Sequence, residues 1–225
     1  MRKATYTHGD RLEQSPKSKT FFIDIRNVLL FFELEKMHSQ IAKYCLVSIE
    51  EVKNALQKNG WGEKYEQGEI DSRTLFHKLS PEVQGSKGFA SWMDTISDVF
   101  RPNDSLTPII KELKQRKIKL FTLSNICEAH FNYAYIHFPI LHLFDGHLLS
   151  YELKKKKPDP EFYKEALQKA CTDKQHCFYV DGIEEYVKIA RALGIDSELY
   201  TNPSTLRLQL TQRDFLESPE ITGTH

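Results

Sequence analysis

The chain has 225 residues, about one and a half times the ~150 of a typical domain, so we expect one large domain or a core with an insertion. Hydrophobic residues make up 40 % and charged residues 28 %, a globular rather than a disordered composition. Lys plus Arg and Asp plus Glu both total 31, which gives a formal net charge of zero. Because nucleic-acid binding usually requires a basic excess, we expect no nucleic-acid partner.

The apolar segments are short, and the polar first nineteen residues lack the apolar stretch of a secretory signal. None of the segments approaches the ~20 apolar residues of a membrane span. The four cysteines show neither CxxC spacing nor the density of a disulfide framework. These features predict a soluble cytoplasmic protein with structural thiols and no membrane partner.

The N-terminal part of the sequence predicts a flexible arm, then a buried strand. Residues 1–18 are polar and lack apolar periodicity, whereas residues 20–32 are strongly apolar and suit a strand buried on both faces, followed by a loop. Asp24, Arg26 and Asn27 interrupt that run. Open α/β sheets place their binding crevice just past the carboxyl ends of strands. The alternative is a strand end that simply reaches the surface.

Residues 34–100 show helical patterns and predict an all-helical insertion. Ser48 and Glu51 have the spacing of a capping box, and Gly60 is a stop signal for that helix. A second helix is expected to begin at Asp71 or Ser72. We expect three aromatic residues of this insertion to form its own core rather than to contact substrate: Trp61, Tyr65 and Trp92.

After residue 100, helical and strand patterns alternate, which predicts a doubly wound, Rossmann-like parallel sheet in an α/β fold. Its core would comprise residues 19–33 and 101–213, followed by a flexible tail over residues 214–225. The expected helices begin near Thr107, behind Asp159 and after Asp181, the last one ending at Gly194, and the expected strands cover residues 118–123, 176–180 and 198–201.

Three predicted strands end in a polar residue at the same relative place: Asp24, Ser124 and Asp181. Lys157 lies in the loop before the Pro-Asp-Pro helix start. Each of the four also has a purely structural explanation. Asp24 could cap a loop, and Ser124 could be an ordinary loop hydroxyl. Asp181 could be a turn residue or a helix N-cap, and Lys157 could be one member of a solvated run of lysines. The order and spacing of all four together indicate an active site at one edge of the sheet.

Four segments, FFIDIRNVLL, LFTLSN, KKPDPEFYKEAL and CFYVDGIEEYVKIARALGI, resemble the ordered motifs of the haloacid dehalogenase (HAD)-like hydrolases. The resemblance covers about residues 20–201, and the helical insertion would correspond to the C1 cap of that family. The pattern is most similar to the branch of small sugar-phosphate phosphatases and epoxide-hydrolase N-terminal domains. It implies hydrolysis of a small phosphorylated metabolite.

The resemblance also implies a role for each polar residue. Asp24 would be the nucleophile that forms an aspartyl-phosphate, Ser124 would donate to the phosphoryl group with Asn125 beside it, and Lys157 would restrain nucleophile and substrate. Mg²⁺ would be the cofactor, held by Asp24 and Asp181. Glu185 would be a further metal ligand through water, or else an exposed acid in the first turn of a helix.

Two positions depart from the family pattern. Arg26 stands where phosphatases of the family usually carry a second aspartate as general acid and base, and a guanidinium cannot cycle a proton. Its charge would weaken Mg²⁺ binding, although it could grip a phosphate or carboxylate, or turn into solvent. Gly182 replaces a second acidic residue that often follows the position of Asp181.

These departures leave three functions open. The first is a Mg²⁺-dependent phosphatase, which Arg26 could impair. The second is a catalytically inactive protein of this fold that binds a ligand or a protein. The third is a metal-free 2-haloacid dehalogenase, because dehalogenases also lack the second aspartate. The histidines show no ligand spacing that indicates zinc.

Overall fold

The computed structural model describes residues 18–79 and 88–218, and its centre is a five-stranded parallel sheet in the order β5-β4-β1-β6-β7. The parallel sheet flanked by helices confirms the predicted α/β fold. Residues 1–17 of the arm expected over 1–18, and residues 219–225 of the expected tail, lie outside the described residues. The strands are β1 (Thr20–Ile23), β4 (Lys119–Ser124), β5 (Gly146–Leu149), β6 (Cys177–Asp181) and β7 (Asp196–Leu199).

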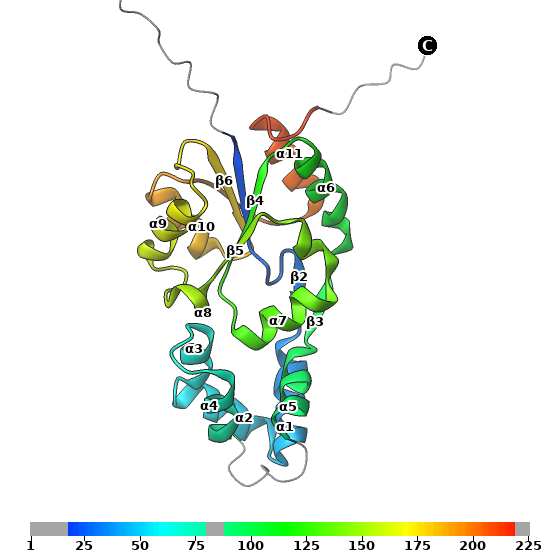
Figure 1. The fold of residues 1–225 in the computed structure, drawn as a ribbon, viewed down its shortest axis with the longest axis vertical. Helices are drawn as coiled ribbons and strands as arrows, with labels where there is room; N and C mark the ends of the chain where they lie inside the picture. Colours follow the sequence, from blue (N-terminus) through cyan, green and yellow to red (C-terminus); the bar gives the residue numbers. More distant parts are fainter. Residues whose placement is uncertain (1–17, 80–87, 219–225) are drawn as a thin grey trace, which may run out of the picture.

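Helices cover both faces of this sheet, which is why its central strands are apolar on both sides (Figure 1). Phe21 and Phe178 face α6 and α11, whereas Phe22 and Tyr179 face α9 and α10. One layer thus holds α6 (Thr107–Gln115) and α11 (Pro203–Gln212), and the other holds α9 (Pro160–Lys169) and α10 (Glu184–Ala192). Between sheet and cap lie α7 (Glu128–His137) and α8 (Ser150–Leu153), and two 3-10 turns cover Asp104–Leu106 and Pro139–Leu143.

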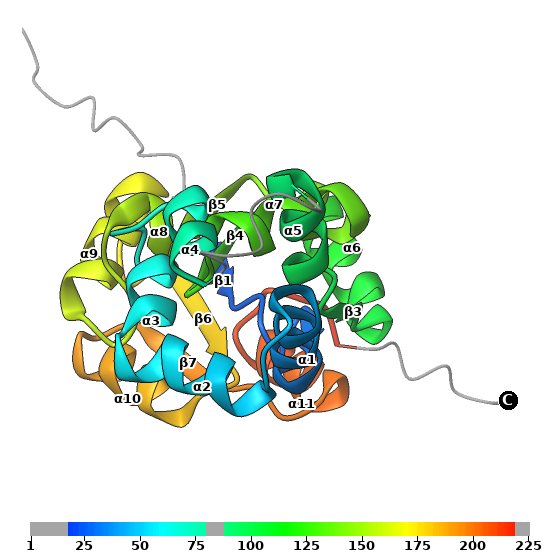
Figure 2. The ribbon, with the colours of Figure 1, turned by 90° about the horizontal axis from the view of Figure 1, so that it is seen from below.

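Five helices form a separate lobe below the carboxyl edge of the sheet (Figures 1 and 2). They pack around Trp92 and Tyr65, in a cluster that also reaches Cys127 and Ala129 of the core. Ser48 and Glu51 form the predicted capping box. The helices are α1 (Leu34–Cys45), α2 (Ile49–Lys58), α3 (Trp61–Glu66), α4 (Ser72–Leu79) and α5 (Gly88–Ser97).

The apolar run of residues 20–32 contains two strands rather than the single expected one. A turn after Ile25, with Asn27 in a left-handed conformation at φ +58°, separates β1 from β2 (Leu30–Phe32). β2 pairs antiparallel with β3 (Phe100–Pro102), so the two chain segments between core and cap lie side by side. The sequence did not predict β2, β3, β5, α7, α8 or α11, and β7 begins at Asp196 instead of residue 198.

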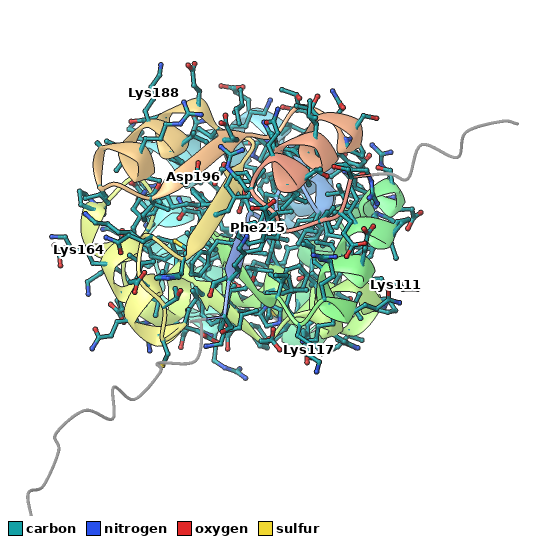
Figure 3. The ribbon with its side chains drawn as sticks, turned by 90° about the horizontal axis from the view of Figure 1, so that it is seen from above. Lys111, Lys117, Lys164, Lys188, Asp196 and Phe215 are labelled. Atoms are coloured by element: carbon teal, nitrogen blue, oxygen red, sulfur yellow. The ribbon has the colours of Figure 1, made fainter. Side chains whose placement is uncertain are left out.

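The end of the sheet opposite the cap is closed by the segment after α11. Phe215 is 5 % exposed and its ring centroid lies 6.0 Å from that of Phe178, so the described part of the expected tail packs on the core. Figure 3 shows Phe215 over the middle of this end, with Lys111, Lys164 and Lys188 at the periphery. Among the described helices, none is both long and apolar enough to cross a membrane.

Candidate active site

The carboxyl ends of three neighbouring strands bring the predicted residues together. Asp24 directly follows β1, Ser124 ends β4 and Asp181 ends β6. β1 pairs in parallel with both other strands, and Ile23 is aligned with Thr122 and Val180. All three polar side chains are buried. Parallel pairing therefore gathers polar groups from segments of the sequence about a hundred and fifty residues apart.

Lys157 joins the two carboxylates. Its ammonium Nζ lies 3.1 Å from Asp24 Oδ1 and 2.5 Å from Asp181 Oδ2, and it donates to the carbonyl of Leu123 at 2.8 Å. Burial disfavours the charge, but the two carboxylates outweigh it, so the pKa of Lys157 is raised above its usual value. The side chain is 1 % exposed, unlike a solvated member of a lysine run. Lys157 is thus a buried, permanent cation at neutral pH.

Asn125 fixes the main chain of Lys157 from both sides. Its amide Nδ2 donates to the Lys157 carbonyl, and the Lys157 N–H donates to its Oδ1, both at 2.8 Å. The sequence analysis expected Asn125, beside Ser124, to bind substrate, and that role stays a prediction. In the structure both ends of its amide contact the main chain of Lys157, so Asn125 positions Lys157.

Asp181 is held by three donors. Its Oδ1 accepts from the Ile183 N–H at 2.8 Å, and its Oδ2 accepts from Lys157 and from the Tyr179 hydroxyl. Burial and then the Asp181 charge raise the pKa of Tyr179 well above its usual value, so this hydroxyl remains a donor. The sequence analysis missed Tyr179 because it lies in an apolar strand. Its spacing of two from Asp181 places both on one face of β6 and was the available signal.

Two buried oxygens of the site lack hydrogen bonds within the described part of the chain. They are Ser124 Oγ, which lies close enough to Asp24 to lower the pKa of that carboxyl, and Asp24 Oδ1, which forms the ion pair with Lys157. Burial raises the pKa of Asp24, Lys157 partly offsets this, and Asp181 raises it further. Buried polar atoms without partners are uncommon and call for an explanation. A phosphoryl group or a cation would supply the missing partners.

The donor set fits Mg²⁺. Mg²⁺ prefers oxygen ligands and is commonly held by one or two carboxylates, with waters and substrate phosphate completing its shell. Asp24 and Asp181 would hold it, since Asp24 Oδ1 lacks a hydrogen bond and Asp181 Oδ1 accepts only one. Two carboxylates would thus be the protein's share of the ligands, because residues 18–79 and 88–218 contain no group of three or more His, Cys, Asp or Glu side chains that could hold a metal. Glu185 is exposed in the first turn of α10, so its role as a ligand stays a prediction.

Arg26 points toward the cap, a direction that the sequence analysis did not foresee. Its Nη1 lies 2.7 Å from Glu66 Oε1 at the end of α3, and its guanidinium stacks 5.1 Å from the ring centroid of Phe32. The side chain is 26 % exposed. It therefore does not simply turn into solvent: it pairs with a carboxylate of the cap, that of Glu66, and links core to cap. Its expected contact with a substrate phosphate or carboxylate stays a prediction.

Comparisons with known proteins place these residues in context. The sequence model of the haloacid dehalogenase-like hydrolases matches residues 46–199, which include Ser124, Lys157 and Asp181 but begin after Asp24. The sesquiterpene phosphatase astK of Aspergillus oryzae is 27 % identical over 168 residues, covering 74 % of this chain and 85 % of that protein.

Two groups of solved structures have a similar fold. The HAD family enzyme bt-2542 of Bacteroides thetaiotaomicron is 23 % identical with a TM-score of 0.72, covering 82 % of this chain and 94 % of that one. A 2-haloacid dehalogenase from Pseudomonas syringae pv. tomato is 17 % identical with a TM-score of 0.65, covering 87 % and 99 %. The shared fold therefore includes an enzyme named only by its family and one named a 2-haloacid dehalogenase.

Proposed function

Because the chain belongs to the haloacid dehalogenase-like hydrolase family, we propose that it is a Mg²⁺-dependent phosphatase that cleaves a phosphate monoester through an aspartyl-phosphate on Asp24. The observation that carries the proposal is the buried cluster of Asp24, Lys157 and Asp181 beside the unpartnered hydroxyl of Ser124. Two relatives support it: one is named a phosphatase, and bt-2542 has been solved in complex with magnesium and inorganic phosphate.

In the proposed reaction, each residue of the cluster has a separate role. The Asp24 carboxylate attacks phosphorus, the bond from phosphorus to the ester oxygen breaks, and the released alkoxide takes a proton from water. Water then attacks the phosphorus of the aspartyl-phosphate, which releases inorganic phosphate and restores Asp24. In this proposal the Ser124 hydroxyl donates to a phosphoryl oxygen. The Lys157 ammonium, whose N–H groups contact Asp24, Asp181 and the Leu123 carbonyl, holds the nucleophile and contributes positive charge beside the phosphoryl group. When bound, Mg²⁺ supplies further neutralisation of phosphoryl charge.

Arg26 has a consequence for this chemistry. At the position where the family usually has an acid/base aspartate, the chain has a guanidinium that is paired with Glu66 and cannot give up its proton. The leaving group is therefore expelled without help from that position. We expect turnover to fall steeply as the leaving alcohol becomes less acidic.

The test is hydrolysis of para-nitrophenyl phosphate and a panel of alkyl and sugar phosphates, with and without Mg²⁺. Turnover should require Mg²⁺, and Asp24→Asn should reduce kcat by about 10⁴-fold or more, as expected for loss of a nucleophile. Glu184→Gln is a matched control, because Glu184 is an exposed acid outside the cluster. Full activity of Asp24→Asn would overturn the proposal.

Arg26 also favours a second function, an inactive protein that keeps the fold for binding. If the wild type turns over nothing and Arg26→Asp gains Mg²⁺-dependent hydrolysis, the inactive-protein proposal replaces the phosphatase. Release of halide from a 2-haloacid without metal would instead support a dehalogenase. The three outcomes exclude one another in a single set of assays.

A further inference from the structure

A cavity of about 500 Å³ lies between the cap helices and the core. This volume falls within the roughly 300–1,000 Å³ of small-molecule sites. Helices α1 to α5 all contribute to its cap side, α3 with Gly62, Glu63, Tyr65 and Glu66, and β2 and α7 contribute to its core side. The apolar side chains that line it include Phe32, Met37, Ile41, Leu56, Leu75 and Ile96.

The charges around this cavity are already neutralised by the protein. Arg26 pairs with Glu66, and Lys156 with Glu63. The two histidines in the lining, His38 and His130, are uncharged at neutral pH, because burial lowers the pKa of both, for His130 to about 4. Gln57 and the buried Nδ1 of His38, which has no hydrogen bond within the described residues, are the neutral polar groups left in the lining. They are too few for the several hydroxyls of a sugar, and burying the other hydroxyls without partners is costly. The lining suits a hydrocarbon group.

The cavity borders the catalytic loops, although Asp24, Ser124 and Lys157 are not themselves part of its lining. Arg26 lies two residues after Asp24, and Cys127 lies two residues after Asn125, and both line the cavity. A substrate whose phosphate meets Asp24 would extend its alcohol portion past these residues toward the cap. The occupant of the cavity is thus the leaving group of the reaction.

Resting on the proposed phosphatase, we infer that the substrate is the phosphate ester of an extended apolar alcohol, whose hydrocarbon part fills the cap cavity. The apolar lining provides affinity through burial of methylene groups, and phosphate recognition stays at the sheet edge. Specificity then depends on chain length more than on hydroxyl pattern.

The first experiment measures kcat/KM for butyl, hexyl, octyl and dodecyl phosphate, all below their micelle concentrations, and for a sugar phosphate. The acidity of the leaving alcohol is constant along the alkyl series, so only chain length varies. We expect a gain of about fourfold per methylene until the cavity is full. Equal values for butyl and dodecyl phosphate, or a preference for the sugar phosphate, would overturn the inference and leave the phosphatase standing.

The second experiment changes the cavity itself. Leu56→Trp on α2 fills space in the lining and should lower kcat/KM for dodecyl phosphate at least tenfold while sparing butyl phosphate. Ile49→Trp is the matched control, because Ile49 lies on the same helix, is 41 % exposed and is not part of the lining. The inference would be contradicted if Leu56→Trp lowered kcat/KM equally for butyl and dodecyl phosphate and left the binding of dodecyl phosphate unchanged.

A binding measurement separates the two proposals. Calorimetry on Asp24→Asn, with 1-dodecanol and 1-butanol as probes, requires no turnover. Tighter binding of dodecanol that Leu56→Trp weakens would support the cavity inference even if no phosphate ester were hydrolysed. Absence of dodecanol binding by a folded protein would overturn it, whatever the phosphatase assays show.

Discussion

At the scale of single residues, the site is defined by an imbalance of charge. Asp24 and Asp181 share one buried ammonium, that of Lys157, which leaves an excess negative charge in a place shielded from water. A phosphate dianion would add to that excess. A bound divalent cation removes the conflict, which is the physical reason for expecting hydrolysis to depend on Mg²⁺.

The same imbalance should make Asp24 unfavourable for folding in the absence of metal. Its pKa is raised by burial, so above that pKa the ionised carboxylate lowers the free energy of unfolding. The penalty is lost as the pH falls through the raised pKa toward the ordinary value of about 4. We expect Asp24→Asn to raise the free energy of unfolding by about 0.5–2 kcal/mol at pH 8, and by less at pH 4. Urea unfolding of the metal-free proteins measures both values.

Asp94→Asn serves as the control for that experiment. Asp94 is exposed on α5, so its substitution should change the free energy of unfolding by less than about 0.5 kcal/mol at either pH. A loss of stability in Asp24→Asn at pH 8 would mean that the ion pair with Lys157 outweighs the cost of burial. The stability gained in Asp24→Asn should accompany loss of hydrolysis.

At the scale of helices and strands, the sequence analysis predicted the elements that a local pattern of apolar and polar residues defines. β1, β4 and β6 were predicted because each is an apolar run ending in a polar residue, and those endings located Asp24, Ser124 and Asp181. β5 was missed because its first two residues are Gly146 and His147, so only its last two residues are apolar. β2 was missed because its residues continue the apolar run of β1, and only the turn at Asn27 divides them.

The missed contacts share a different cause. The pairing of Arg26 with Glu66 and the clamp of Asn125 on Lys157 join residues 40 and 32 positions apart. Neither sequence separation corresponds to the period of a helix or a strand, so no periodicity in the sequence could predict these contacts. They follow only from the placement of the cap and of the loop before α9 against the sheet.

The segment after α11 closes the far end of the sheet, and we expect it to contribute strongly to stability. Phe215 packs on Phe21 and Phe178, so Phe215→Ala should lower the free energy of unfolding by about 3–5 kcal/mol, as for other buried aromatic residues. Leu208→Ala on α11 is the control, since Leu208 is 57 % exposed. Urea unfolding measures both, and equal small effects would show that this segment does not pack on the core in solution.

At the scale of the whole molecule, helix α3 joins the cap to two segments of the core by hydrogen bonds. Its Tyr65 hydroxyl accepts from the Ala129 N–H, and the Ser150 hydroxyl donates to the carbonyl of Glu66. The Arg26–Glu66 ion pair adds a third link on the same helix. Loss of this pair should therefore loosen α3 while the fold and the sheet remain intact.

A double-mutant cycle with Arg26→Met and Glu66→Gln tests this link. Both side chains are partly exposed, so water screens the pair and its coupling energy should be only about 0.2–1 kcal/mol. Arg26→Met also retains an apolar contact for Phe32, which separates the loss of charge from the loss of packing. Hydrogen exchange should become faster in α3 and α8 in both variants, and stay unchanged in the strands. Lys188→Met, with Lys188 exposed on α10 far from the cap, is the control. Faster exchange throughout the sheet would show that the pair stabilises the core rather than holding the cap.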